Sequence, residues 1–337
     1  MDIKSLGEFG LIERIRRSLP QKAEGLVKGI GDDCAVFDVP EGWSLLATCD
    51  SLVSGVHFLE GCDPFLVGKK AVAVNVSDVA AMGGVPAFLL VSLGLPPETP
   101  AFFVDRLYEG LAEEAARFGA AVIGGNLTGS PERVFVDVTL IGRVERGKAI
   151  YRGGAKPGDV VAVTGAPGEA AAGLALLLNP EISVDEKIRR RLVRAHESPE
   201  PRLAEGRLMA ASGLVTACVD VSDGLLADLG HILSESGVGA DIFEDRAPVS
   251  DPLREAAYVL GKNPLDFTLL GGGDYELCFT VRGESFDAFR KIWRQSLETP
   301  VAEIGRITEA RRGIRILDEN GRERRPPHAG GWDHFAR

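Results

Sequence analysis

The chain has 337 residues, 45% of them hydrophobic and 26% charged, a composition typical of globular proteins with room for two hydrophobic cores. A formal net charge of −11 without a basic run argues against a nucleic-acid partner, and the lack of an apolar run of about 18 residues argues against a membrane span. The five cysteines form no C-x-x-C pair, which disfavours zinc and disulfides and, with no signal-like N-terminus, leads us to expect a cytoplasmic protein.

The first predicted elements end at acidic residues. A short helix is expected over 8–19, and the glycine turn 29–36 carries an adjacent pair of carboxylates that includes Asp33. Adjacent carboxylates repel each other unless a cation lies between them, although a solvated loop tolerates such a pair. The strand 43–48 then delivers Asp50 to its end.

The helix expected from Asp63 to Gly83 is almost wholly apolar, so Asn75 and Asp78 within it should be buried. A buried carboxylate is costly unless it is paired or bound to a metal. The ordinary alternative is a hydrogen bond to local backbone. A strand at 87–95 should follow.

A second long helix is expected after a Thr99–Pro100 cap. The strand 121–123 should run into the glycine-rich stretch 124–129, predicted to be a loop whose backbone can approach a phosphate. Alternation then predicts a half-buried strand over 134–144. The polar stretch 146–159 is the predicted domain boundary.

The second half alternates strands and helices. Its predicted strands are 160–164, 214–219, 240–243, 277–281 and 301–307, with helices between them. The strand 214–219 enters the acidic stretch 220–223. We interpret Asp228 and Asp245 as solvated acids and the run 322–325 as a solvated tail.

The motifs that are absent narrow the chemistry. There is no G-x-x-x-x-G-K-[ST], no kinase-type glycine loop, no G-x-S-x-G and no H-E-x-x-H. Many Asp, few His and several glycine-rich stretches favour a site that holds a nucleotide through Mg2+, because oxygen ligands suit this cation and phosphoryl transfer needs mainly positioning and charge neutralisation.

Seven motifs in order resemble the thiamine-monophosphate kinase family. They are GDDCA at 31–35, DSLVSGVHF at 50–58, AVNVSDVAAMG at 73–83, RGGAKPGD at 152–159, DVSDGL at 220–225, GGDYEL at 272–277 and WDHF at 332–335. The wider superfamily includes aminoimidazole ribonucleotide (AIR) synthetase, selenophosphate synthetase and a hydrogenase-maturation protein.

The resemblance implies a two-domain α+β fold of the AIR synthetase (PurM-like) type. Residues 1–148 would form the ATP- and Mg2+-binding domain, which dimerises through its sheet, and 149–337 the second α+β domain. It also implies ATP-dependent phosphorylation of thiamine monophosphate to thiamine diphosphate. Because the acceptor is itself an ionised phosphate, with a second pKa of about 6, we assign no residue as a general base.

The resemblance also implies roles for individual residues. Metal-binding positions would be Asp33, Thr48, Cys49, Asp50, Asp78, Asn126, Asp220 and Asp223. ATP-contacting positions would be Tyr108, Gly125, Asn126, Arg152 and Ser222. Substrate-contacting positions would be His57, Gly273 and Trp332.

Three positions depart from the family pattern. Cys49 replaces a usual Thr, so only its backbone carbonyl suits a hard cation. Asn126 replaces a metal-binding Asp, and Gly273 replaces a Glu that contacts substrate. We consider Asp274 and Glu276 as replacements for the lost carboxylate.

Two other functions stay open at this point. A synthetase-like relative would use the same ATP site to phosphorylate a carbonyl or carbamoyl oxygen. The second open function is a non-catalytic protein that binds a nucleotide or thiamine. It stays open because Gly273 and Asn126 stand where the family has carboxylates.

Overall fold

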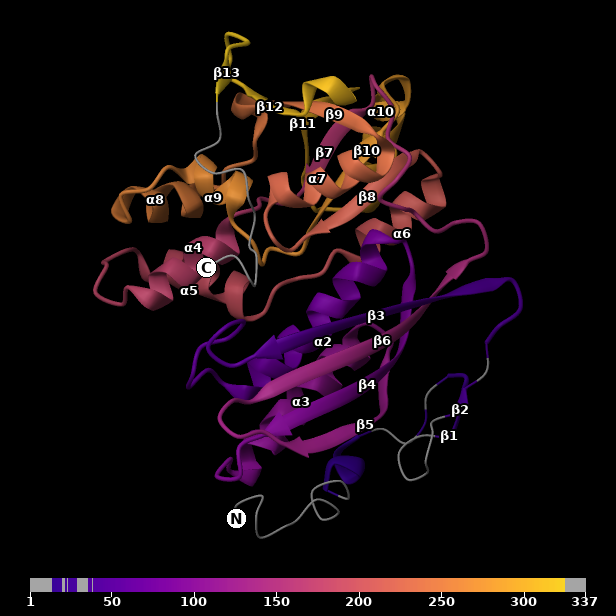
Figure 1. Ribbon diagram of the computed structural model, residues 1–337, viewed down its shortest axis with the longest axis vertical. Helices are drawn as coiled ribbons and strands as arrows, with labels where there is room; N and C mark the ends of the chain where they lie inside the picture. Colours follow the sequence, from indigo (N-terminus) through magenta and orange to yellow (C-terminus); the bar gives the residue numbers. More distant parts are fainter. Residues whose placement is uncertain (1–13, 20–21, 23, 29–35, 38, 325–337) are drawn as a thin grey trace. The chain divides into compact units, whose positions relative to one another are not determined.

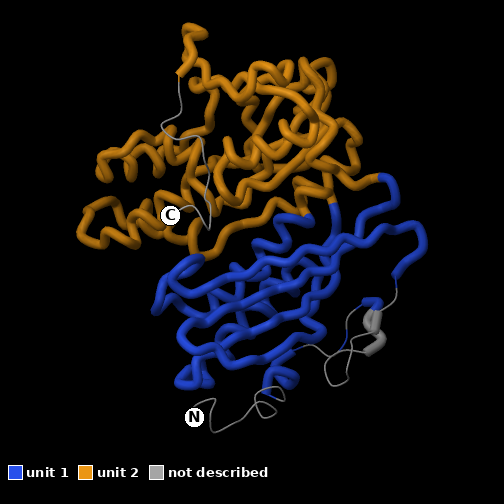
Figure 2. The backbone as a smooth tube through the Cα atoms, in the orientation of Figure 1, with its two compact units in different colours: residues 1–79, 84–147 blue, residues 80–83, 148–337 orange. Residues whose placement is uncertain are grey.

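The computed structural model describes residues 14–19, 22, 24–28, 36–37 and 39–324. The chain divides into two compact units, Met1–Val79 with Gly84–Gly147 and Ala80–Gly83 with Lys148–Arg337 (Figure 2). Figure 1 labels the helices and strands of both units. The described part of the chain contains no helix long and apolar enough to cross a membrane.

Unit 1 is built on a four-stranded sheet in the order β3-β6-β4-β5. Its strands are β3 (Trp43–Val53), β4 (Val85–Leu95), β5 (Ala121–Gly129) and β6 (Phe135–Glu145). Only the β4–β5 pair is parallel. The unit also contains the short pair β1 (Leu26–Lys28) and β2 (Val36–Phe37) and the helices α2 (Pro64–Ala81) and α3 (Ala101–Arg117).

The two faces of this sheet differ in burial. Along β6 the even-numbered residues are buried and the odd-numbered ones only half-buried. Val136, Val138 and Leu140 are fully buried, and they pair with Leu52, Asp50 and Thr48 of β3. Because side chains alternate along a strand, Thr48 and Asp50 lie on the buried face, whereas Cys49 and Ser51 lie on the other.

Two glycines let α2 and α3 pack closely. A Cβ on Gly68 would lie 2.1 Å from the carbonyl oxygen of Leu107, and one on Gly110 would lie 2.0 Å from that of Phe65. Neither helix can therefore accept a larger residue at its glycine. This contact and the apolar sequence of α2 explain why α2 is buried nearly throughout.

Unit 2 is built on a seven-stranded sheet in the order β13-β12-β9-β11-β7-β10-β8, antiparallel except for the β12–β9 pair. The strands are β7 (Val160–Thr164), β8 (Val215–Val221), β9 (Val238–Phe243), β10 (Glu276–Val281), β11 (Val301–Glu309), β12 (Ile314–Leu317) and β13 (Glu323–Arg324). The helices are α4 (Glu169–Leu178), α5 (Glu186–Glu197), α6 (Leu203–Ser212), α7 (Leu225–Ser236), α8 (Asp251–Val259), α9 (Pro264–Leu270) and α10 (Phe286–Ser296). Single 3-10 turns are η1 (Glu244–Arg246), η2 (Gly283–Ser285) and η3 (Ala310–Arg312).

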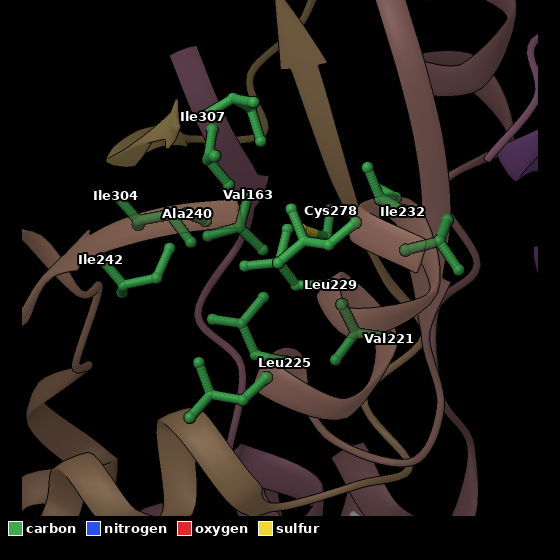
Figure 3. Packing of buried hydrophobic residues seen from close by; sticks show 14 of the residues in the cluster. Val163, Val221, Leu225, Leu229, Ile232, Ala240, Ile242, Cys278, Ile304 and Ile307 are labelled. Carbon is green, nitrogen blue, oxygen red and sulfur yellow. The ribbon is translucent and has the colours of Figure 1, made fainter. Parts of the chain in front are cut away.

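Hydrophobic cores cover both faces of this sheet. On one face Val163, Leu229 and Cys278 pack together with side chains of α7, β9 and β11 (Figure 3). On the other, Phe279 packs against Phe289 and Trp293 of α10, with ring centroids 5.4 and 6.1 Å away. The strands β7 and β10 are apolar except for Thr164, Glu276 and Thr280, and every residue in them is buried.

Several local predictions need correction. The stretch 124–129 is not a loop but the continuation of β5, and a Cβ on Gly125 would lie 1.9 Å from the carbonyl oxygen of Val91. The glycine is therefore needed for close strand packing. Thr99 does not cap α3, whose N-cap is Pro100 without a side-chain hydrogen bond.

The run 322–325 is not simply a solvated tail. Its described part contains β13, where Arg324 pairs with Glu244 at 3.1 Å and with Asp266 at 3.2 Å. Of the predicted helix 8–19, only 14–19 lie in the described residues, and 14–18 are helical.

Candidate functional site

The first group of predicted ligands lies where α2 meets the buried face of the sheet in unit 1. The Thr48 hydroxyl donates a hydrogen bond to Oδ2 of Asp78. Asp50, two residues further along β3, lies on the same face. A hydroxyl and carboxylates in such an arrangement are hard oxygen donors of the kind that Mg2+ prefers.

Asn75 supplies an independent sign that this region of α2 is built for a ligand. It is fully buried, its amide donates to the carbonyl oxygen of Ala71, and its Oδ1 has no hydrogen-bond partner. It precedes Asp78 by three residues, so both lie on one face of the helix. A buried acceptor without a partner costs about 1–3 kcal/mol, which a cation or its bound water would relieve. The residues present therefore fit Mg2+.

Cys49 lies on the opposite face of β3, where its thiol contacts Asp137 at 3.4 Å and accepts from Thr139 at 3.4 Å. The Thr139 hydrogen bond lowers the pKa of Cys49, but burial and the Asp137 carboxylate outweigh it and the pKa is raised. Ser51 also donates to Asp137. The thiol thus has no role on the Asp78 side, which leaves the backbone carbonyl of Cys49 as its candidate ligand.

Asn126 is not brought together with Thr48 and Asp50 within one chain. It pairs with Ser92 of β4, between the fully buried Val91 and Leu93, so it lies on the face opposite to Asp50. It also stands on β5, and β3 and β5 are the two edges of the sheet. Three strand spacings, about 14 Å in all, separate these edges.

His57 is held by one hydrogen bond to its ring and another to its backbone carbonyl. The Val53 N–H donates to Nδ1 at 3.0 Å, and Nζ of Lys70 donates to the His57 carbonyl oxygen at 3.0 Å. Because Nδ1 accepts, the proton of the neutral imidazole is on Nε2. The ring therefore presents Nε2–H as a donor, which suits a phosphate oxygen.

Tyr108, predicted to contact ATP, is buried on α3, and burial raises the pKa of its hydroxyl. The phenol is therefore protonated. Gly125 lies in β5, where its φ of +158° and its contact with β4 account for the glycine.

The second group of predicted ligands lies in unit 2, in the segment from the end of β8 to the start of α7. Asp220 is the last residue but one of β8 and is only 5% exposed. The backbone N–H groups of Ser222, Asp223 and Gly224 all donate to Oδ2 of Asp228, at 3.0, 3.0 and 3.1 Å. Asp228 is thus not a solvated acid, and sequence reasoning missed its role.

Asp228 is 3% exposed, and burial raises its pKa to about 7, although the three backbone N–H groups act in the opposite direction. The signal available in the sequence was its position, four residues after Gly224 and in the first turn of an expected helix. A carboxylate there is well placed to accept from the orphan N–H groups of the helix start.

A glycine-rich segment, 271–275, packs directly on this acidic loop. The Gly273 N–H donates to the Ser222 carbonyl oxygen at 2.7 Å, and the Tyr275 N–H to that of Val221 at 2.8 Å. A Cβ on Gly272 would lie 2.5 Å from the Ser222 oxygen, so the close approach requires glycine. The predicted ATP-contacting Ser222 and the predicted substrate-contacting Gly273 are therefore neighbours in one rigid assembly of loops.

The two carboxylates that follow Gly273 already accept hydrogen bonds from other residues of unit 2. Asp274 accepts from the N–H groups of Gly168 and Ala170 at the start of α4, at 2.7 and 2.9 Å, and burial raises its pKa to about 7. Glu276 accepts two hydrogen bonds of 2.6 Å from Arg202. Neither carboxylate is placed to replace the family's Glu at position 273.

Arg152 is exposed at the start of the glycine-rich segment that precedes β7. This segment is held by Ser236, whose hydroxyl accepts from Gly154 and Ala155 at 3.1 Å each. An exposed guanidinium on an anchored loop suits recognition of phosphate oxygens.

The predicted site therefore falls into groups. Unit 1 brings Thr48 and Asp78 together, and unit 2 brings Ser222, Asp223 and Gly273 together. Asp33 and Trp332 lie outside the described residues. Among the residues described, no three His, Cys, Asp or Glu side chains form a cluster that could hold a metal ion.

Comparison with known proteins defines the class of the chain. Residues 31–144 match the family described as AIR synthase related protein, N-terminal domain, and residues 156–318 match AIR synthase related protein, C-terminal domain. The predicted two-domain AIR synthetase-like fold is thus confirmed.

Three curated relatives are thiamine-monophosphate kinases. That of Escherichia coli O157:H7 is 38% identical over 98% of both chains, that of Aquifex aeolicus 37% over 99% of this chain and 100% of its own, and that of Mycobacterium tuberculosis 42% over 87% of this chain and 86% of its own. The chain belongs to the thiamine-monophosphate kinase family.

Solved structures agree with this assignment. The thiamine-monophosphate kinase of Stenotrophomonas maltophilia has a TM-score of 0.81 at 37% identity, covering 92% of this chain and 96% of its own. AaThiL complexed with AMPPCP and TMP has a TM-score of 0.77 at 37% identity, covering 99% of both chains.

Proposed function

We propose that this protein transfers the terminal phosphoryl group of ATP to the phosphate of thiamine monophosphate, forming thiamine diphosphate and ADP. The observation that carries this proposal is the paired oxygen donors of Thr48 and Asp78 beside the orphaned Oδ1 of Asn75. The kinases to which the chain is similar, and the complex of AaThiL with an ATP analogue and TMP, support the choice of substrates.

The chemistry asks for little beyond positioning and charge neutralisation. Bound Mg2+ would neutralise phosphate charge as two anions approach each other. On the protein side, the metal-holding residues are Asp33, Thr48, the Cys49 carbonyl, Asp50, Asp78, Asp220 and Asp223. The N-terminal domain, 1–148, would bind ATP and Mg2+. The second domain, 149–337, would supply the remaining residues that contact the substrates.

Each remaining residue has one task. The residues that contact or surround ATP are Arg152, Ser222, Gly125 and Tyr108. The Nε2–H of His57 donates to an oxygen of the acceptor phosphate, and Trp332 offers an aromatic face to the cationic thiazolium. No side chain removes a proton, because the acceptor phosphate is largely ionised near pH 7, its second pKa being about 6.

We further propose that the active form is a homodimer and that Asn126 acts in the site of the other copy. Asn126 stands on the opposite edge and face of the sheet from Asp50, so one chain cannot place both on one ion. In a symmetric dimer whose ATP sites lie at the interface, Asp50 of one copy and Asn126 of the other would contribute to one site. Within the described residues β3 and β5 are the edge strands of this sheet, which supports a contact between copies there.

Cytoplasm is the proposed location. In the described part of the chain Cys49, Cys62, Cys218 and Cys278 are all free thiols, which suits a reducing compartment.

The test is ADP release from ATP and Mg2+ with and without thiamine monophosphate, with thiamine diphosphate measured as the product. One thiamine diphosphate per ADP is the expected result. Tight binding of thiamine monophosphate without ADP release would instead indicate a binding protein, and ADP release stimulated only by a carbonyl or carbamoyl acceptor would indicate a synthetase.

A further inference from the structure

The acidic loop before α7 stands where many folds bind phosphate directly. A helix start with several backbone N–H groups on one side is a ready anion site. Here the N–H groups of Ser222, Asp223 and Gly224 all point to Oδ2 of Asp228, at 3.0 to 3.1 Å. Asp228, only 3% exposed, thus occupies the place that a phosphate oxygen would take.

The carbonyl groups of the loop are also bonded inside the unit. Those of Val221 and Ser222 accept from the glycine-rich segment 271–275, and that of Gly224 accepts from the N–H of Asp228 at 2.9 Å. Three N–H groups and three carbonyl groups of this loop are therefore already bonded, which leaves the side chains of Ser222 and Asp223 as the groups that would meet a ligand.

We propose that Asp228 is a positioning residue that makes this loop bind a divalent cation instead of a bare phosphate. Its carboxyl group occupies the backbone N–H groups, holds Asp223 in place and adds a third carboxyl group to a segment that already carries Asp220 and Asp223. The loop then meets ATP phosphates through Mg2+. This inference rests on the proposed function and names the part of the site that selects metal-bound nucleotide.

The test compares Asp228→Asn and Asp228→Ala with wild type. Asp228→Asn keeps an oxygen acceptor and removes the charge, whereas Asp228→Ala removes both. Asp185→Asn is the matched control, because Asp185 accepts from Lys187 and Ile188 at the start of α5 in the same unit. All variants are first compared with wild type by circular dichroism.

Two binding readouts accompany activity. Mn2+ binding in the presence of a non-hydrolysable ATP analogue, followed by electron paramagnetic resonance, should weaken about tenfold or more in both Asp228 variants, as for other residues that orient metal ligands. Protection of the protein by inorganic phosphate against thermal unfolding, without metal, should appear in Asp228→Ala alone. The Mg2+ concentration for half-maximal activity should rise about tenfold in Asp228→Asn, with the KM for thiamine monophosphate within twofold of wild type.

Unchanged Mn2+ affinity in a folded Asp228→Asn protein, or a loss of equal size in Asp185→Asn, would overturn the inference. So would a wild-type protein that binds no Mn2+. A wild-type protein that binds Mn2+ with this Asp228 dependence but forms no thiamine diphosphate would leave the inference standing and refute the proposed function.

Discussion

Single side chains in this protein show whether a polar group is present for structure or for a ligand. Asp274 and Glu276 are each satisfied by groups of their own unit, whereas Oδ1 of Asn75 is buried without a partner. Native proteins leave few such groups unpaired, which supports the proposal that a cation or its bound water meets Asn75. The same face of α2 carries Asp78.

Asp78→Asn tests the metal-binding role of that face. The amide keeps the size of the carboxylate and removes its charge, so we expect kcat to fall about 100-fold or more while the fold is retained. Asp63→Asn at the start of the same helix is the control, because Asp63 is exposed, caps α2 and pairs only with Arg106, at 3.5 Å on the surface, among the contacts described. Steady-state kinetics and circular dichroism measure both. Wild-type turnover in Asp78→Asn would remove the carboxylate from the mechanism.

Gly273→Glu restores the carboxylate that the family carries at this position. Space is available, since a Cβ there would meet only Ala170 at 3.7 Å, but the φ of +86° is unfavourable for any side chain. We expect a loss of about 1 kcal/mol in unfolding free energy and a KM for thiamine monophosphate about tenfold lower. Gly273→Gln separates the two effects, since it shares the strain without the charge. Equal KM values for the Glu and Gln variants would contradict a charge contact.

At the scale of elements, the predicted site residues of unit 2 lie in short connections between helices and strands. An ion pair near these connections joins several elements. Arg202, just before α6, bonds Glu276 at the start of β10, and Thr164 at the end of β7 donates to the same carboxylate at 2.6 Å. One buried charge pair thus joins three elements below the glycine-rich segment 271–275. Such a pair specifies an arrangement more than it adds net stability.

Arg202→Met should nevertheless be strongly destabilising, because it leaves Glu276 buried without its partner. We expect about 3–5 kcal/mol loss in unfolding free energy, measured by urea denaturation. Arg190→Met provides the control, since Arg190 forms an exposed pair with Glu186 at 2.8 Å and should cost less than about 0.5 kcal/mol. Similar losses of unfolding free energy in the two variants would show that the Arg202–Glu276 pair contributes no more to stability than an exposed ion pair.

At the scale of the whole molecule, stability should depend on pH through Asp274. Burial raises its pKa to about 7, whereas in the unfolded chain it lies near the ordinary value of about 3.9. The native state therefore binds this proton more tightly. The contribution to stability is fully present below about pH 4 and is lost as the pH rises through about 7.

Urea denaturation at about pH 5 and pH 8 measures this dependence. From pH 5 to pH 8 the unfolding free energy of wild type should fall by more than that of Asp274→Asn. The substitution also weakens the hydrogen bonds from Gly168 and Ala170, but this loss does not affect the comparison of the two pH dependences. Identical pH dependence in the two proteins would show that Asp274 is ionised throughout.

Complementation between copies tests the dimer proposal at the same scale. Asp50→Asn and Asn126→Ala should each abolish activity, but mixed and reassociated chains should recover about a quarter of wild-type activity. Half of the dimers would then be mixed, and one of their two sites would be intact. A chain with both changes, mixed with either single variant, is the control and should recover nothing. If Asn126 acts within its own chain, no mixture recovers.

Much of this protein is determined by the sequence alone. The alternation of β6, the largely apolar runs of β7 and β10 and the Asp63–Pro64 start of α2 are local patterns, and the elements form where these patterns predict them. The ordered motifs likewise predict the family and the two-domain fold, because residues that hold phosphate and metal recur at characteristic places along the chain.

Other features were decided only by tertiary structure. Whether Gly125 lies in a loop or a strand depends on its distance from Val91, and whether Asp228 is solvated depends on the turn that folds over it. The strand order that places Asn126 and Asp50 at opposite edges is a property of pairing between distant segments. Local sequence does not encode these facts, because burial and pairing arise only when segments far apart in the chain come together.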